Sequence, residues 1–312
     1  MHTLQSWPIP DSYRDHAGDL PDSAEWLPGL SVTAARLAAD WEVEPDGPAT
    51  HGWVSMVWPV RDNAGRRYVL KVSPPLSWSS DEPRCLQAWA EHTDHEAEVR
   101  MVPPARASVP DRAVLLPRLD ADRPLQRHPD IVEANAIIGG LLAGISEVIA
   151  PPGMPTLAEE LAMTREQLDP AGPVPAHHVE RARSTVDDLL AELARHGAPL
   201  SLLHRDLHYL NVLHTLPDEP AAWVGIDPLP LAGLREWELT PMLRNRWDDA
   251  AATGDPDRAL RRRVDQVAEI AGLDPFLVRR CSQIVAAEAL QRLLPDRTDH
   301  LFAAPYSIMV GW

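Results

Sequence analysis

The first third of the chain combines short β-type runs with short helical patterns. Residues rich in β-branched and aromatic side chains predict strands over residues 54–60, 68–72, 99–102 and 113–116. The turn-forming residues 61–65 separate the first two runs, which predicts a hairpin. Apolar positions recur at helical spacing in residues 31–41 and 82–92, and Pro83 stands where a helix tolerates proline, close to its start.

After residues 118–124 the pattern changes to long amphipathic stretches of helical period. They predict helices over residues 131–149, 156–168, 176–195, 236–247, 256–271 and 275–294, with short strands at 212–213 and 223–226. The predicted organisation is a small, antiparallel, β-rich N-lobe over residues 1–118 and a larger, mainly helical C-lobe over residues 119–312. The expected fold class is therefore α+β and bilobal.

Composition narrows the class of protein. With 45% hydrophobic and 24% charged residues, the 312-residue chain resembles an ordinary globular protein. Its net charge of -17 argues against a nucleic-acid partner and favours a cationic or neutral small molecule, although an acidic surface can simply reflect solubility. The longest apolar stretch, 136–150, is broken by glycines and Glu147, and residues 1–22 lack a basic start followed by an apolar run. We therefore expect a cytoplasmic protein without membrane contact, monomeric or homodimeric.

Lys71 is the only lysine among 29 basic residues, the others being arginines. An ammonium is a compact point charge on a flexible stem, which suits contact with a nucleotide phosphate. Chance survival of one lysine is the alternative interpretation. The position of Lys71, near the end of the second predicted hairpin strand, favours the phosphate.

A second group of polar residues, His204, Asp206 and Asn211, follows the pattern His-x-Asp-x-x-x-x-Asn. Asp227 comes at the end of the strand predicted at 223–226. Phosphoryl transfer needs a proton acceptor for the attacking hydroxyl, oxygen ligands for magnesium and a fixed positive charge over the phosphates. Asp206 is predicted to be the proton acceptor, and Asn211 and Asp227 the magnesium ligands. Lys71 would supply the positive charge, with Glu82 on the following helix as its ion-pair partner. The chain is thus predicted to be an ATP- and magnesium-dependent kinase.

Further residues are candidates for contacts with the two substrates. Gly52 and Ser55 lie where a glycine-rich lid over ATP is expected, and Arg118 stands at the predicted lobe boundary. A Walker A loop is excluded, because the only lysine is not preceded by glycine. Acidic residues downstream of Asp227 are candidates for binding a cationic acceptor, either directly or only as helix caps and solvated charges: Glu236, Glu238, Asp248 and Asp249. The run 261–263 of three arginines is interpreted as a solvated helix face.

These motifs resemble those of the aminoglycoside phosphotransferases of the protein-kinase-like fold, and within them the streptomycin 6-kinase and hydroxyurea-kinase group. The resemblance covers nearly the whole chain and rests on residues 203–213, 225–228, 231–233 and 243–249, together with 10–13 and 24–27. The chain departs from the family pattern at Arg205, Leu234 and Glu238. The resemblance implies ATP, magnesium, a catalytic Asp206, and an acceptor such as streptomycin, another aminocyclitol or a sugar-like compound.

Two alternatives stay open beside an antibiotic kinase. One is a metabolic kinase of an amino sugar or another small hydroxylated compound, because loops that build an acceptor pocket vary while the phosphate machinery stays. The other is a pseudokinase that binds nucleotide as a regulatory module. The complete set of Lys71, Asp206, Asn211 and Asp227 argues against the pseudokinase.

Overall fold

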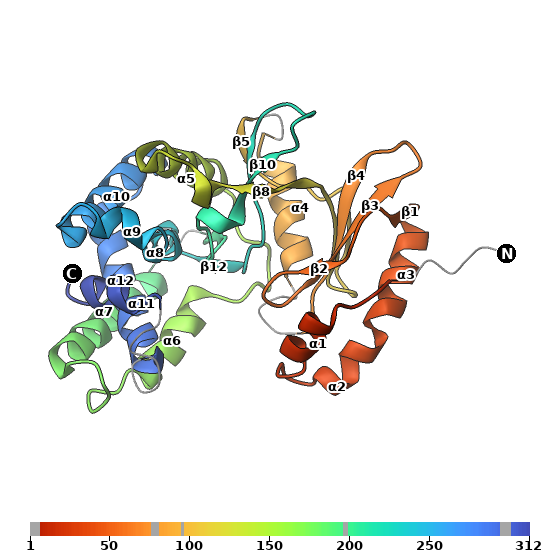
Figure 1. Ribbon diagram of the computed structural model, residues 1–312. Coiled ribbons are helices and arrows are strands. Elements are labelled where there is room, and N and C mark those ends of the chain that lie inside the picture. The colour runs from red at the N-terminus through yellow and green to blue at the C-terminus, as the bar shows by residue number, and fades with distance from the viewer. Residues whose placement is uncertain (1–6, 76–80, 95–96, 196–198, 294–300) are drawn as a thin grey trace.

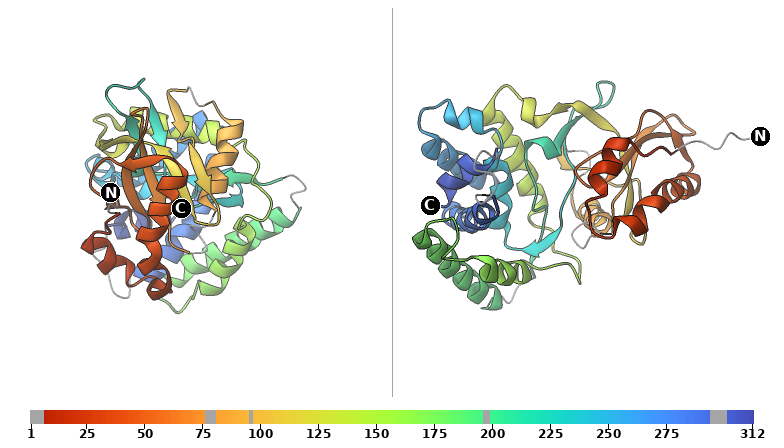
Figure 2. Two further views of the ribbon diagram at one scale, coloured as in Figure 1. Left: turned by 90° about the vertical axis from the view of Figure 1, so that its right-hand side faces the viewer. Right: turned by 60° about the horizontal axis from the view of Figure 1, so that its bottom comes forward.

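The computed structural model describes residues 7–75, 81–94, 97–195, 199–293 and 301–312. A smaller lobe built on an antiparallel sheet lies beside a larger, mainly helical lobe (Figure 1). The right-hand view in Figure 2 shows the helices of the C-terminal half gathered away from the sheet of the N-terminal half. The predicted α+β, bilobal arrangement is confirmed.

The sheet of the smaller lobe has the strand order β1-β3-β4-β7-β6, and β2 pairs with β3. Its strands are β1 (Val43–Pro45), β2 (Thr50–His51), β3 (Met56–Asp62), β4 (Arg67–Val72), β6 (Arg106–Ser108) and β7 (Ala113–Pro117). The predicted hairpin is formed by β3 and β4. Asp62 closes its turn, because its carboxylate accepts the backbone N–H groups of Ala64 and Arg66, both at 2.9 Å.

Helices cover both faces of this sheet. They are α1 (Asp11–Ala17), α2 (Ser23–Trp26), α3 (Leu30–Asp40) and α4 (Glu82–His92). Leu70 and Val72 of β4 are buried in an apolar core that includes residues of α1 and α3. Val69 instead packs against the core that contains α4. Successive side chains of a strand point to opposite faces, so Lys71 lies on the α4 side, the side of its predicted partner Glu82.

Two further small sheets accompany the six-stranded sheet. The first has the order β5-β11-β10-β8, and in the second β12 pairs with β9. Their strands are β5 (Val99–Met101), β8 (Leu119–Pro124), β9 (Ser201–Leu203), β10 (Val212–Thr215), β11 (Trp223–Gly225) and β12 (Leu231–Gly233). Because β5 pairs in parallel with β11, this sheet crosses the lobe boundary that we propose at residue 118. The boundary therefore divides the sequence where its pattern changes, but strand pairing crosses it.

The larger lobe contains the remaining helices. They are α5 (Ile131–Ile145), α6 (Leu157–Gln167), α7 (Ala176–Arg195), α8 (Thr240–Arg244), α9 (Trp247–Ala251), α10 (Pro256–Ala271), α11 (Pro275–Leu293) and α12 (Ala303–Met309). Short 3-10 turns are η1 (Leu27–Gly29), η2 (Leu125–Arg127), η3 (Tyr209–Asn211) and η4 (Arg235–Leu239). Thr156 and Glu159 form a capping box that fixes the start of α6. Among the described residues, no helix has both the length and the apolar composition that crossing a bilayer requires.

Most predicted helices are present with small changes at their ends. The helix predicted over 131–149 ends at Ile145, and residue 294 of the range 275–294 lies outside the described residues. The single helix predicted over 236–247 is wrong. This segment contains η4, α8 and the start of α9, because Asn245 is extended and Arg246 has a left-handed backbone with φ of 50°.

Candidate active site

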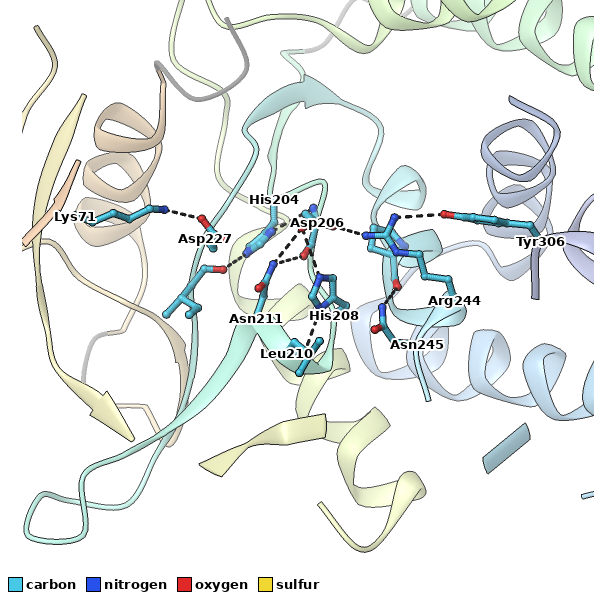
Figure 3. A network of polar contacts seen from close by, with 12 residues as sticks. Lys71, His204, Asp206, His208, Leu210, Asn211, Asp227, Arg244, Asn245 and Tyr306 are labelled. Atoms are coloured by element: carbon cyan, nitrogen blue, oxygen red, sulfur yellow. Dashed lines mark hydrogen bonds and ion pairs between the residues drawn. The ribbon is translucent and has the colours of Figure 1, made fainter. Parts of the chain in front are cut away.

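The Lys71 ammonium is held between two carboxylates from different parts of the chain. Its Nζ lies 2.6 Å from Oε1 of Glu82. It also lies 2.5 Å from Oδ1 of Asp227, the contact drawn in Figure 3. Burial alone would lower the pKa of Lys71, but Asp227 and Glu82 outweigh it and hold the pKa above its ordinary value. The predicted ion pair with Glu82 is therefore present, and the ammonium stays charged in a largely buried place.

The segment 204–211 connects β9 to β10 and carries the second part of the site. Asp206 accepts a hydrogen bond from Nδ2 of Asn211 at 3.2 Å and another from the Arg244 guanidinium at 2.7 Å. Tyr209 anchors the segment to α5, because its hydroxyl donates to Asn135 Oδ1 at 2.6 Å in the interior. Arg205 has a left-handed backbone with φ of 63°, which costs about 1–2 kcal/mol for a residue with a Cβ atom. Such strain commonly occurs at functional sites.

His204 is a buried support of this segment. It is fully buried, and its ring stacks on Trp89 with centroids 6.1 Å apart. Burial lowers the pKa of His204 to about 4, so the ring is neutral near pH 7. Its Nε2 lies 3.0 Å from the carbonyl oxygen of Ile226, which requires the proton on Nε2 and leaves Nδ1 to accept the backbone N–H of Asp206.

Glu238 contacts the backbone of the Asp206 segment and is not among the residues that line the cavity beside Asp206. Its carboxylate accepts the backbone N–H of Arg205 at 3.1 and 3.2 Å, and the residue is 2% exposed. Glu238 thus holds the strained Arg205 in place, the anchoring role that the sequence left open as the alternative to binding a substrate. Burial raises the pKa of Glu238 to about 8, although the backbone N–H groups act in the opposite direction.

This buried acid makes stability depend on pH. The pKa of Glu238 in the folded protein, about 8, lies above its ordinary value of 4.5, so the folded state binds more protons than the unfolded state between these values. We expect the free energy of unfolding to fall as pH rises from about 5 to about 8, and Glu238→Gln to lose this component. Urea denaturation of both proteins at several pH values measures it. Parallel pH dependences would show that Glu238 is already ionised at pH 5.

Asp248 and Asp249 are placed away from Asp206 by the break after α8. Asp249 pairs with Nε of Arg246 at 2.6 Å, and Asp248 is exposed. Neither is among the residues that line the cavity beside Asp206. Glu236, the fourth acidic candidate, accepts the backbone N–H of Asp274 at 3.4 Å and is likewise absent from that lining. Their choice as candidates for acceptor binding assumed one continuous helix over 236–247 beside them, and that helix does not form.

A cavity of about 300 Å³ opens between the lobes on the Lys71 side. Apolar side chains from both lobes form most of its wall, and Lys71 and Asp227 lie at its polar end. Gly52 and Ser55 line it from the β2–β3 turn. Arg118 also lines it, with its guanidinium bound to the carbonyl of Val60 at 2.9 Å. A mainly apolar cavity with an ammonium and a carboxylate in its wall fits a nucleotide, whose base is apolar and whose phosphates are anionic.

A second cavity, of about 490 Å³, lies next to the first on the Asp206 side. Trp53 lines both cavities, and its side chain is 79% exposed. Three carboxylates and three guanidinium groups line the second cavity and form pairs, Glu160 with Arg205, Asp206 with Arg244, and Glu288 with Arg292, at 2.7, 2.7 and 3.5 Å. The charge of this cavity is therefore balanced, unlike that of the whole chain.

Sequence reasoning missed several of these residues. Arg244 lies within the quoted motif 243–249, and Trp53 lies next to the glycine of the predicted lid, so a signal existed for both. Glu160 on α6 and Glu288 on α11 carried no signal. They meet in the cavity only because of how the helices pack.

Asn211 and Asp227 form a donor set that suits a hard metal ion bound together with phosphates. Asn211 precedes β10 and Asp227 follows β11, and Val212 pairs with Gly225, so both side chains lie at the same end of this ladder. Both hydrogen bonds of the Asn211 side chain use its Nδ2 atom, which leaves the amide oxygen for a cation. The described residues contain no group of three His, Cys, Asp or Glu side chains around one point. A magnesium ion would thus need nucleotide oxygens and water as further ligands.

A β-rich lobe with a buried Lys–Glu pair, facing an Asp-to-Asn segment and a second Asp on the helical lobe, defines the class of protein-kinase-like phosphotransferases. An ADP-bound aminoglycoside phosphotransferase has the same fold, with a TM-score of 0.51 at 12% identity over 90% of this chain and 96% of that chain.

The family follows from closer similarity. Residues 40–292 match the model of the aminoglycoside/hydroxyurea antibiotic resistance kinase family. A streptomycin 6-kinase of Streptomyces griseus is 33% identical over 81% of this chain and 78% of its own. A hydroxyurea phosphotransferase of Kitasatospora aureofaciens is 36% identical over 71% of this chain and 63% of its own. The chain belongs to the aminoglycoside/hydroxyurea antibiotic resistance kinase family, and is an enzyme that transfers phosphate to an alcohol group.

Proposed function

We propose that this enzyme transfers the γ-phosphate of ATP, with magnesium, to a hydroxyl of an aminocyclitol or aminoglycoside such as streptomycin. One observation carries the proposal. Asp227 lines the cavity that suits a nucleotide, Asp206 lines the adjoining cavity, and Trp53 lines both. A phosphoryl group moving from one cavity to the other would pass between these two carboxylates.

Each residue has a separate task in this scheme. Lys71 binds phosphate oxygens, and Glu82 keeps its ammonium aimed at them. Asn211 and Asp227 hold magnesium, which neutralises charge on the phosphates when it is bound. Asp206 orients the attacking hydroxyl and accepts its proton as the new bond to phosphorus forms and the bond to the leaving ADP breaks. The hydroxyl loses one proton and gains one phosphoryl group, so the transfer is balanced.

The acceptor class rests on the relatives, and one structural observation favours a second candidate. Streptomycin 6-kinase is among the similar proteins, which supports an aminocyclitol. Each carboxylate of the second cavity already pairs with an arginine, however, so the cavity has no surplus negative charge that would attract a dication. A neutral or singly charged hydroxylated compound, such as an amino sugar, depends less on such attraction. We keep this metabolic kinase as the second candidate.

Release of ADP from MgATP in the presence of single acceptors tests both candidates. The panel contains streptomycin, other aminocyclitols, hydroxyurea, amino sugars and neutral sugars, each at low and high salt. We expect turnover with an aminocyclitol, its loss when EDTA removes magnesium, and a product heavier by one phosphate in mass spectrometry. Turnover confined to an uncharged sugar, without salt dependence, would instead support the second candidate. Tight ATP binding without turnover on any acceptor would contradict both candidate functions and favour the pseudokinase.

A further inference from the structure

Arg244, the last residue of α8, links the Asp206 segment to the C-terminal helix. One guanidinium nitrogen donates to Oδ1 of Asp206 at 2.7 Å, and the other terminal nitrogen lies 3.3 Å from the hydroxyl oxygen of Tyr306 (Figure 3). The guanidinium carbon lies 5.0 Å from the centre of the Phe302 ring. The direction of this arginine is therefore set by α12 and the residue before it, more than 50 positions away in sequence.

The two oxygens of Asp206 are used unequally. Oδ2 accepts from Asn211 at 3.2 Å and lies 3.5 Å from Nε2 of His208. Among the described residues, Oδ1 has only the contact with Arg244. A carboxylate oxygen has two acceptor directions, so Oδ1 keeps one for an incoming hydroxyl. Asp206 and Arg244 both line the second cavity, which puts this free direction beside the guanidinium.

We propose that Arg244 is a positioning residue for the transfer, which fixes Oδ1 of Asp206 toward the acceptor cavity while α12, through Tyr306, fixes Arg244. This inference rests on the proposed function, in which Asp206 receives the hydroxyl proton. The carboxylate is then held from both sides, by Arg244 on one oxygen and by Asn211 and His208 on the other. A hydroxyl that enters the cavity meets an acceptor atom whose direction is already set.

The guanidinium of Arg244 is not fully satisfied in this position. Its Nε is buried and has no hydrogen-bond partner among the described residues, which costs free energy. The terminal nitrogens of the same guanidinium are directed at Asp206 and Tyr306.

The test compares Arg244→Met, Arg244→Lys and Tyr306→Phe in the full chain. We expect Arg244→Met to lower kcat by about tenfold to a hundredfold, the range for one charge-assisted hydrogen bond, with KM for ATP unchanged. Arg244→Lys keeps the charge without the planar fork and should recover part of the loss. Tyr306→Phe removes only the hydroxyl and should lower kcat less, in the same direction. Urea denaturation and ATP binding show whether each variant is folded.

Rescue by the conservative variant provides a readout that a purely structural role would not move. A partial recovery of kcat in Arg244→Lys, with KM for ATP unchanged and equal stability in urea, indicates that the charge beside Oδ1 of Asp206 acts in the transfer itself.

Asp206→Asn and the double variant with Arg244→Met separate the possible failures. Turnover is followed as ADP release with the best acceptor, or as slow ATP hydrolysis by water if no acceptor is used. If Arg244 acts through Asp206, the double variant is no slower than Asp206→Asn alone. Wild-type kcat in Arg244→Met, while Asp206→Asn is inactive, would overturn this inference and leave the proposed function intact. Full activity of Asp206→Asn would overturn the proposed function instead.

Discussion

Replacing Asp206 by asparagine is expected to lower kcat by at least about a hundredfold, the contribution of a positioned base, while the affinity for ATP stays nearly unchanged. The amide has almost the same volume as the carboxylate but cannot accept the proton of the hydroxyl. Asp206 lines the second cavity and is not among the residues of the first, so the nucleotide should bind as before. Single-turnover kinetics with excess enzyme measures the chemical step without product release.

Asp188→Asn is a matched control for this variant. Asp188 lies on α7 with a side chain that is 63% exposed, and it pairs with Arg280 at 2.6 Å. Exposed ion pairs contribute little, so this substitution should change neither kcat nor stability noticeably. If Asp206→Asn turned over as fast as this control, the proton of the acceptor would have to leave by another route and the assignment of Asp206 would be wrong.

The parts of the site that lie close together in sequence were predictable. The alternation of β4 fixes the face on which Lys71 lies, and Pro83 places Glu82 in the first turn of the next helix. Both features depend only on residues that are neighbours in the sequence. The ion pair then needs only that α4 cover that face of the sheet. The Asp206-to-Asn211 spacing is local as well, since one short turn connects the two residues.

Residues brought together only by helix packing could not be predicted in this way. A periodic apolar pattern over 236–247 does not reveal that Asn245 and Arg246 leave the helical conformation. Their carbonyl oxygens are held by the Arg263 guanidinium at 3.1 and 2.9 Å, from a helix that follows later in the chain. Arg263 is 4% exposed, so the interpretation of 261–263 as a solvated face is wrong for this residue. One tertiary contact thus redirects the segment that sequence reasoning assigned to acceptor binding.

Lys71→Arg is expected to lower kcat/KM by at least about a hundredfold, although the chain uses arginine at every other basic position. Nζ has carboxylate oxygens at 2.6 and 2.5 Å on two sides, and the side chain is 10% exposed. A planar guanidinium is wider and longer, and overpacking a buried site costs roughly 1–3 kcal/mol. It would also move the charge away from the phosphates. Steady-state kinetics with varied ATP measures the loss, and Lys71→Met gives the value without any charge.

The opposite outcome has a clear meaning. A Lys71→Arg enzyme with most of the wild-type activity would show that the two ion pairs of Nζ do not require an ammonium, and that the single lysine reflects only drift in composition.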